Sequence, residues 1–263
     1  MLAALAIFLG ALITGSLHPV ANVLMACVSG ACVMAGGNVI NDYLDMPIDQ
    51  INKPGRPLPA RMLQPNQALN FSIILFVLGI FLSIFIKVSA VGLTVFTSAG
   101  LILYSARLKG MALVGNMAVS FYSALAFVYG GLAVGEWKKS LIPAGFAFLF
   151  HLGREIIKDV EDQKADAVNA VKTLPVQFGQ TVAIGVVTGV FGLLILFTLV
   201  PFIFDIYGKG YFWVVLTGVD LVLVIVLVTL WSKPLPDTLR RIALFLKADM
   251  FVGLLAIYIG NLK

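Results

Sequence analysis

The chain has 263 residues, a net charge of +5 and a mean hydropathy of +1.01, and only 12% of its residues are charged. This composition excludes a soluble globular domain, and the apolar runs lack the period-2 alternation of a membrane β-barrel. The sequence therefore predicts an all-α, polytopic membrane protein, with a single integral-membrane domain over residues 1–263.

Polar clusters, prolines and glycines divide the chain into about nine predicted transmembrane helices. An apolar helix of about 20 residues crosses the hydrocarbon core of a bilayer, and the first of the nine is shorter than that. The predicted helices cover residues 1–15, 20–44, 66–87, 90–108, 112–134, 140–161, 177–204, 211–231 and 240–262.

The second predicted helix ends in a polar stretch, "NVINDYLDMPIDQINKPGRPLP". Asn41, Asp45 and Asp49 are spaced i, i+4, i+8, so they share one face of a helix. Like charges at this spacing repel one another unless a cation lies between them, and oxygen ligands without His or Cys are those that Mg²⁺ prefers. Pro47 predicts a kink or a helix end within this row.

Basic residues follow this row directly. Lys53 and Arg56 lie in a Pro/Gly-rich loop and are predicted phosphate ligands, whereas Arg61 is either a further one or a solvated anchor. Asp42 lies one residue off the row and is an alternative metal ligand. We call Asn41, Asp42, Asp45 and Asp49 the first acidic cluster.

A second group of carboxylates lies at the end of the sixth predicted helix. Asp159, Asp162 and Asp166 are spaced i, i+3, i+7 and also share one helical face; we call them the second acidic cluster. A solvated helix end is the alternative interpretation. Four basic residues interleave with this cluster, which are Arg154, Lys158, Lys164 and Lys172, and all but Lys164 are predicted to bind substrate.

The distribution of basic residues predicts the orientation in the membrane. With nine spans, 13 of the 18 Lys and Arg residues, Lys233 among them, fall on the side that receives both acidic clusters. An excess of this kind marks the cytoplasmic side, so the positive net charge does not require a nucleic-acid partner. The other side has five basic residues, which are Lys87, Lys138, Lys139, Lys209 and Lys263.

Taken together, these motifs resemble the UbiA-type intramembrane prenyltransferases over nearly the whole chain. The resemblance rests on the N-x-x-x-D-x-x-x-D row with "KPGRPLP", on "REIIKDVEDQKAD" with "TLPVQFG", and on the segment "LYSARLKGMALVGN" between them. That last segment contains Tyr104, Lys109 and Asn116. For Tyr104, an aromatic anchor at the membrane interface is the alternative.

The resemblance implies a central cavity among the helices, open to lipid and capped by cytoplasmic loops, in which Mg²⁺ and a prenyl diphosphate are bound. The implied metal ligands are Asn41, Asp45, Asp49, Asp159, Asp162 and Asp166. The implied catalytic residues are Asp45, Asp49, Asp162, Asp166, Tyr104 and Lys109, and the implied substrate ligands are Lys53, Arg56, Asn116, Arg154, Lys158 and Lys172.

Among subfamilies, "GREIIKDVED" and the compact length resemble the archaeal enzymes that transfer a geranylgeranyl group to geranylgeranylglyceryl phosphate in ether-lipid synthesis. A prenyltransferase with an aromatic, lipophilic acceptor is the first alternative. A cation-coupled transporter fits less well, because transporters place acidic residues near the bilayer midplane and both clusters here lie at helix ends. The lipid bilayer is the expected environment, and the sequence predicts no oligomeric state.

Overall fold

The computed structural model describes residues 2–168, 171–232 and 235–261, so the basic residues Lys233 and Lys263 lie outside the described residues. Almost all of this part is helical, which confirms the predicted all-α class. Within the described residues, eight helical segments are long and apolar enough to cross a membrane. The predicted first helix is α1 (Leu2–Leu12), which at 11 residues is shorter than a span.

Contacts along the chain gather into two compact units. The first comprises Met1–Lys109 and Leu125–Ser140, and the second comprises Gly110–Ala124 and Leu141–Lys263. The helix α6 (Val114–Ala133) therefore contributes its beginning to the second unit and its end to the first. The first unit also holds α1, α2 (Val20–Leu44), α3 (Met46–Asn52), α4 (Pro65–Ile84), α5 (Val88–Leu103), the π-helical segment η1 (Tyr104–Leu108) and the 3₁₀ turn η2 (Trp137–Ser140).

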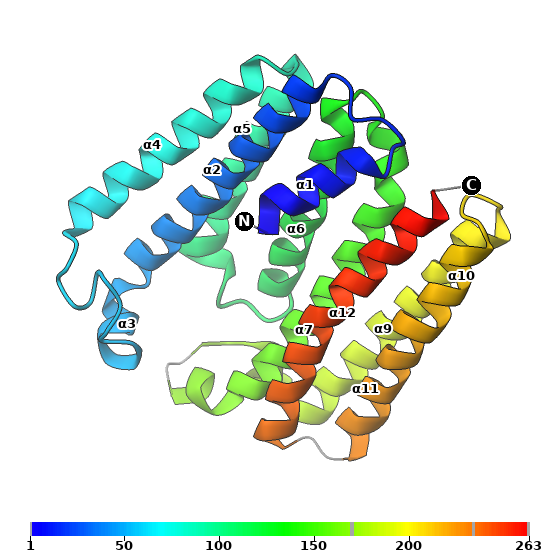
Figure 1. Ribbon diagram of the computed structural model, residues 1–263. Helices are drawn as coiled ribbons and strands as arrows, with labels where there is room; N and C mark the ends of the chain where they lie inside the picture. The colour runs from blue at the N-terminus through cyan, green and yellow to red at the C-terminus, as the bar shows by residue number, and fades with distance from the viewer. Residues whose placement is uncertain (1, 169–170, 233–234, 262–263) are drawn as a thin grey trace. The chain divides into compact units, whose positions relative to one another are not determined.

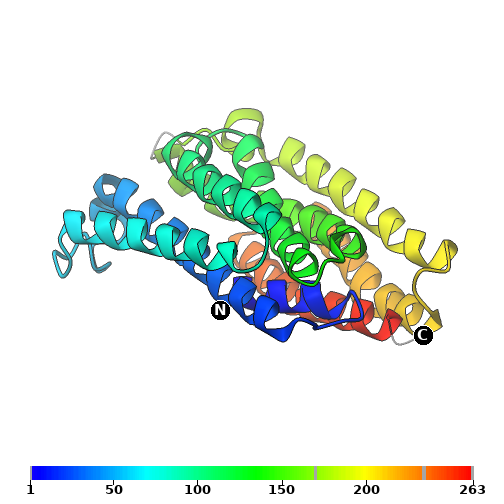
Figure 2. The ribbon, with the colours of Figure 1, turned by 90° about the horizontal axis from the view of Figure 1, so that it is seen from above.

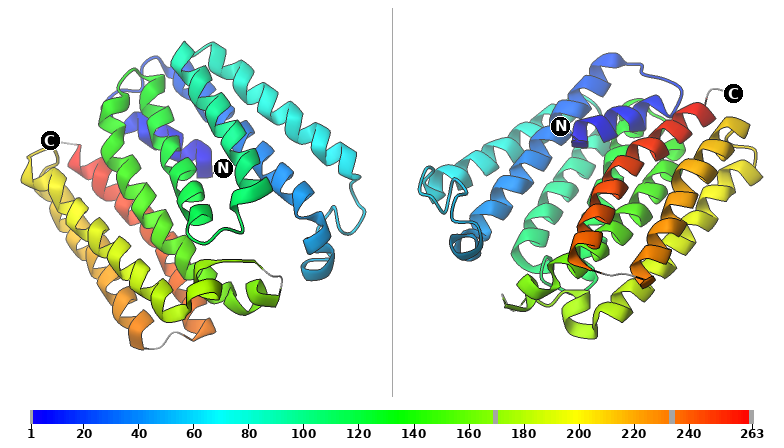
Figure 3. Two further views of the ribbon diagram at one scale, coloured as in Figure 1. Left: turned by 180° about the vertical axis from the view of Figure 1, so that it is seen from behind. Right: turned by 60° about the horizontal axis from the view of Figure 1, so that its bottom comes forward.

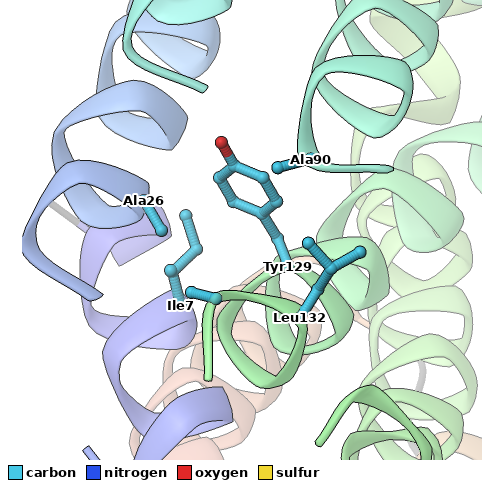
Figure 4. Packing of buried hydrophobic residues seen from close by; sticks show 6 residues of the cluster. Ile7, Ala26, Ala90, Tyr129 and Leu132 are labelled. Atoms are coloured by element: carbon cyan, nitrogen blue, oxygen red, sulfur yellow. The ribbon is translucent and has the colours of Figure 1, made fainter. Parts of the chain in front are cut away.

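In the first unit, α2 packs against α1, α4 and α5, and small polar residues let the helices approach closely (Figure 1). Ser72 of α4 donates a hydrogen bond to the Gly36 carbonyl of α2 at 2.9 Å. A buried cluster around Tyr129 joins residues of α1, α2, α5 and α6 (Figure 4). The Tyr129 hydroxyl lies 2.9 Å from the Ser29 hydroxyl and 3.2 Å from that of Thr94, so this polar group inside the apolar cluster is hydrogen-bonded.

The second unit is built on a long helix, α7 (Leu141–Val168), which packs against α8, α9 and α12. Gly153 of α7 meets the Phe191 ring, since a Cβ there would lie 2.1 Å from a ring carbon. In Figure 3 (right), α11 and α12 run side by side. The remaining elements are α8 (Leu174–Phe178), α9 (Gln180–Ile203), α10 (Lys209–Val215), the π-helical segment η3 (Leu216–Asp220), α11 (Leu221–Ser232) and α12 (Pro236–Gly260).

Of the two predicted helix boundaries near the acidic clusters, one agrees with the structure and one differs from it. The end of α2 at Leu44 agrees with the predicted boundary, and α3 begins again at Met46, so the predicted break near Pro47 is confirmed. The predicted end of the sixth helix at residue 161 is wrong, because α7 continues to Val168. Between Gly153 and Pro175 the sequence has no glycine or proline that would stop the helix.

Candidate active site

The first acidic cluster spans the junction of α2 and α3. The Asp45 N–H donates to the Asn41 carbonyl at 2.8 Å, and the Asp49 N–H donates to the Asp45 carbonyl at 2.8 Å. Pro47 is the second residue of α3. The first N–H groups of a helix have no hydrogen-bond partner within it, so a proline, which lacks the N–H, is tolerated at this position. The helical path therefore continues through the break, and the three side chains keep the i, i+4, i+8 spacing.

Asp45 is bound by an amide and an ammonium group. Asn41 donates from Nδ2 to Oδ2 of Asp45 at 2.9 Å. The Lys109 ammonium, directly after η1, forms a short ion pair with the same Asp45 oxygen and lies 3.3 Å from Oδ1 of Asn41. The structure therefore brings together three of the predicted site residues from two distant parts of the sequence.

The other two carboxylates of this cluster share one arginine. Nη1 of Arg56 lies 2.9 Å from Oδ1 of Asp42 and 2.6 Å from Oδ2 of Asp49. The Asp49 side chain is only 7% exposed, whereas that of Asp42 is 48% exposed. Arg56 lies in the loop between α3 and α4 (Figure 2), so the Pro/Gly-rich segment folds back onto the carboxylates that precede it.

The second acidic cluster lies on the last turns of α7 and has neutral partners. Nδ2 of Asn116, a buried residue of α6, donates to Oδ2 of Asp159 at 2.8 Å. The Thr173 hydroxyl donates to Oδ2 of Asp166 at 3.2 Å. Asp162 is exposed, and in the described part of the chain no ion pair involves it.

Glu155 forms ion pairs with two cations of α7, Arg154 and Lys158. Nη1 of Arg154 lies 2.8 Å from Oε1 of Glu155, and Nζ of Lys158 lies 3.7 Å from its Oε2. Glu155 lies one turn before Asp159 on α7 and was not among the predicted site residues. Lys172 is exposed, and its backbone forms an isolated bridge with Met111.

The remaining predicted ligands lie in less enclosed positions. The side chain of Lys53 is exposed, and so is that of Arg61, which has a left-handed backbone with φ of 58°. Tyr104 is half-buried in η1, five residues before Lys109. Neither Lys53 nor Arg61 takes part in the ion pairs found within the described ranges.

The donor chemistry of the first cluster fits Mg²⁺. In the described part of the chain, no three His, Cys, Asp or Glu residues are close enough to hold a metal alone. Mg²⁺ usually keeps several waters and takes one or two carboxylates plus substrate phosphate, rather than a cage of protein ligands. Asn41, Asp45 and Asp49 offer only oxygen ligands from their side chains, and this set suits a metal whose coordination a phosphate completes.

The chain matches known proteins over almost its whole length. It is 35% identical over 256 residues to a protein named digeranylgeranylglyceryl phosphate synthase from Methanopyrus kandleri, covering 97% of this chain and 93% of that protein. A protein of the same name from Methanothermobacter thermautotrophicus is 35% identical over 263 residues, covering 99% of this chain and 92% of the relative.

Solved structures agree with the sequence matches. A structure described as giving insights into digeranylgeranylglyceryl phosphate synthase in membranes has a TM-score of 0.87 and 32% identity, covering 99% of this chain and 93% of the other. A UbiA homologue from Archaeoglobus fulgidus, bound to DMAPP and Mg²⁺, shares the fold with a TM-score of 0.73 at 19% identity, covering 97% and 96% of the two chains.

The family assignment follows from a match along the chain rather than from one motif. The family model described as the UbiA prenyltransferase family matches residues 2–254, which include both acidic clusters. Together with the helices that can cross a membrane, this makes the protein a multi-pass membrane enzyme that transfers prenyl groups. The chain belongs to the UbiA prenyltransferase family.

Proposed function

We propose that the protein transfers a geranylgeranyl group from its diphosphate to geranylgeranylglyceryl phosphate, in a reaction that depends on Mg²⁺. The acceptor is suggested by the relatives named digeranylgeranylglyceryl phosphate synthase, which this chain matches over more than nine-tenths of their length. Mg²⁺ is suggested by the A. fulgidus homologue bound to DMAPP and Mg²⁺. The product is a glycerol phosphate that bears two twenty-carbon ether chains.

The observation that carries this proposal is the arrangement of charge in the first acidic cluster. Three carboxylates and one amide lie within reach of two cations, Arg56 and Lys109. Carboxylates hold a divalent metal, and Arg and Lys hold phosphate oxygens, so one small region of the first unit provides both parts of a metal–diphosphate site. A structural role alone would not require this combination at one end of α2.

The chemistry requires the diphosphate to leave with the electron pair of the C–O bond. Asn41, Asp45 and Asp49 would hold Mg²⁺, which would supply positive charge to stabilise the leaving diphosphate. Arg56 and Lys109 add their positive charges to the same group as they turn from the carboxylates toward the phosphate oxygens. The aspartates then remain as metal ligands, and Asn41 holds Asp45 in the orientation that its hydrogen bond sets.

The allylic carbon becomes electron-deficient and must be protected from water until the acceptor hydroxyl reacts. Apolar side chains of the membrane-spanning helices exclude water, and Tyr104 is proposed to contact either the diphosphate or this carbon. The acceptor oxygen bonds to the allylic carbon and loses its proton late, so no strong general base is required. Among the residues of α7, Arg154 and Lys158 are proposed to contact substrate phosphate oxygens after leaving Glu155.

We further propose that the second acidic cluster supplies Mg²⁺ ligands for the same reaction and that both clusters face the cytoplasm. The excess of basic residues on their side of the predicted topology supports this orientation. It also places the site on the side where water-soluble diphosphate products are released.

The test is an acceptor comparison with purified protein in detergent or vesicles. Geranylgeranyl diphosphate is supplied with Mg²⁺ and either geranylgeranylglyceryl phosphate or an aromatic acceptor, and the prenylated lipid is measured by mass spectrometry. We expect product only with the glyceryl phosphate, and its loss when EDTA removes the metal. Product with the aromatic acceptor alone would reject the proposed acceptor, and full activity in EDTA would reject the metal.

A further inference from the structure

Two aspartates lie inside the membrane-spanning helices of the second unit, apart from the acidic clusters. Asp220 is the last residue of η3, near the midpoint of the span Lys209–Ser232, and Asp249 is near the midpoint of α12. Both are buried, with 3% and 5% of their surfaces exposed. The second acidic cluster, by contrast, lies on the last turns of α7, so these two aspartates form a separate feature.

The elements that carry the two aspartates are in direct contact. A Cβ at Gly218 of η3 would lie 2.6 Å from Cγ1 of Val252, and one at Gly253 would lie 3.9 Å from Cγ2 of Val219. Asp249 is one turn before Gly253, and Asp220 follows Val219. Because η3 and α12 pack against each other at these positions, the two aspartates lie on neighbouring turns of helices in contact.

The hydrogen-bond donors around this pair are too few for two carboxylates. The Thr198 hydroxyl lies 3.1 Å from each oxygen of Asp220 and 2.7 Å from the Ile195 carbonyl. A hydroxyl has a single proton to donate, and the Tyr211 hydroxyl donates its own to the Thr198 carbonyl at 2.7 Å. Oδ2 of Asp249 is buried and has no hydrogen-bond partner in the described part of the chain.

The two aspartates are also not neutralised by an ion pair in the part of the chain that the structure describes. Ionised carboxylates at membrane depth are costly and are normally paired or placed at a functional site. A buried carboxyl oxygen without a partner therefore calls for a ligand that brings positive charge.

We propose that Asp220 and Asp249, with the Thr198 hydroxyl, form a buried site that takes up a single positive charge, carried by a proton or by Na⁺. The ligands are hard oxygen atoms, which suit a small hard cation. The π-helical turn η3, which contains Asp220, also supports a cation site. A π-bulge alters the hydrogen bonds of backbone carbonyls and is frequently found at functional sites. Acidic residues at mid-span beside irregular helix are also where membrane transporters hold Na⁺ or H⁺.

The first measurement detects the proton. A hydrophobic carbodiimide adds to a protonated carboxyl group, with the acid proton passing to its nitrogen and the carboxyl oxygen bonding to its central carbon. We expect modification of Asp249 or Asp220 at neutral pH in sodium-free vesicles, located by peptide mass spectrometry. The exposed Asp237 of the same helix α12 is the internal control and should stay unmodified, because a hydrophobic reagent concentrates in the bilayer and not at a water-exposed helix end.

The second measurement tests Na⁺. Labelling and thermal unfolding are compared in NaCl and in N-methylglucamine chloride of equal ionic strength. If Na⁺ takes the site, it slows labelling severalfold and raises Tm by a few degrees. Asp249→Asn should abolish both effects, whereas Asp237→Asn should leave them unchanged. If labelling occurs and Na⁺ has no effect, the site holds a proton.

The proposal is wrong if neither aspartate is labelled in the unsubstituted protein and Na⁺ does not raise its Tm. This outcome needs no variant, so a folding failure of Asp249→Asn would leave the test intact. Thr198→Val, which removes the shared hydroxyl and keeps the shape, offers a second variant. It should weaken the Na⁺ effect if the metal ion binds, or change the labelling rate if a proton is held.

Discussion

The two acidic clusters have similar spacing but opposite ways of dealing with their charge. In the first, Asp45 is paired with Lys109, and Asp42 and Asp49 share Arg56. In the second, Asp159 accepts a bond from the neutral amide of Asn116 and Asp166 from the hydroxyl of Thr173. The nearby cations Arg154 and Lys158 are taken by Glu155 instead.

The ion pairs of the first cluster indicate that it is the one that would rearrange if Mg²⁺ and diphosphate bind as proposed. In the proposed mechanism, Mg²⁺ at the first cluster would draw Lys109 and Arg56 away from the carboxylates and toward the phosphate oxygens. In the second cluster, the hydrogen bonds found within the described ranges reach Asp159 and Asp166 from an amide and a hydroxyl. We therefore expect both clusters to be needed for activity, and only the first to depend on its ion pairs for stability without metal.

The largest expected effect comes from removing one carboxylate of either cluster. Asp45→Ala and Asp162→Ala should each lower prenyl transfer by about 10³-fold or more, since each removes a proposed ligand of the metal that stabilises the leaving group. Only Asp45→Ala should also lower the stability of the metal-free protein, by about 0.5–1 kcal/mol, because it leaves Lys109 unpaired. Turnover and thermal unfolding in EDTA measure the two effects.

The control for this pair is Asp237→Asn, an exposed change outside both clusters that should alter neither quantity. Near-normal turnover in either Ala variant would remove that aspartate from the proposed site. Equal destabilisation by both would contradict the contrast drawn between the clusters.

The next effect concerns Arg56, which joins the loop after α3 to the first cluster. Arg56→Gln should lower kcat/KM by about 10²-fold, because it removes a charge proposed to stabilise the diphosphate. Arg56→Lys keeps the charge but not the planar fork, so it should recover part of this loss. Steady-state kinetics with varied geranylgeranyl diphosphate tests both variants. An equal loss of kcat/KM in Arg56→Gln and Arg56→Lys would mean that Arg56 contributes the shape of its guanidinium group and not its charge.

Much of the first cluster follows from local sequence. The i, i+4, i+8 spacing of Asn41, Asp45 and Asp49 and the break at Pro47 depend on neighbours within a few turns, so helical geometry alone was enough to predict them. The pairing of Asp45 with Lys109 joins residues 64 positions apart. It depends on how η1 packs beside α2, which a single sequence does not encode locally.

The second cluster was harder to predict for two physical reasons. The charged run after residue 161 was open to interpretation as a solvated helix end, but Gln163, Lys164 and two alanines in it are good helix formers and no breaker interrupts them. The helix α7 therefore continues to Val168. The bond from Asn116 to Asp159 crosses 43 positions. The sequence indicated Asn116 as a polar residue at a helix start, but the family resemblance suggested only a substrate contact.

A smaller loss of activity is expected when Asn116, the neutral hydrogen-bond donor to Asp159, is replaced. Asn116→Ala removes a hydrogen bond to a charged group, worth about 1.5–3 kcal/mol, so we expect kcat to fall about tenfold to 10²-fold through misplacement of Asp159. Asn116→Asp should be worse, because it sets a second carboxylate against the first. Higher Mg²⁺ should partly rescue Asn116→Asp but not Asn116→Ala. Rescue of neither would indicate that Asn116 acts in folding alone.

The smallest effect is expected at Asp42, which shares Arg56 with Asp49. Both partners of the Asp42–Arg56 pair are over a third exposed, and exposed pairs contribute about 0–1 kcal/mol. Asp42→Asn keeps an oxygen that can accept from Arg56, so KM for the diphosphate should rise no more than about fivefold while kcat stays unchanged. Asp49→Asn changes the buried partner of the same arginine, which is also a proposed metal ligand, so it should lower kcat sharply. A fall in kcat for Asp42→Asn that matches the fall for Asp49→Asn would make Asp42 a metal ligand in its own right, in addition to Asn41, Asp45 and Asp49.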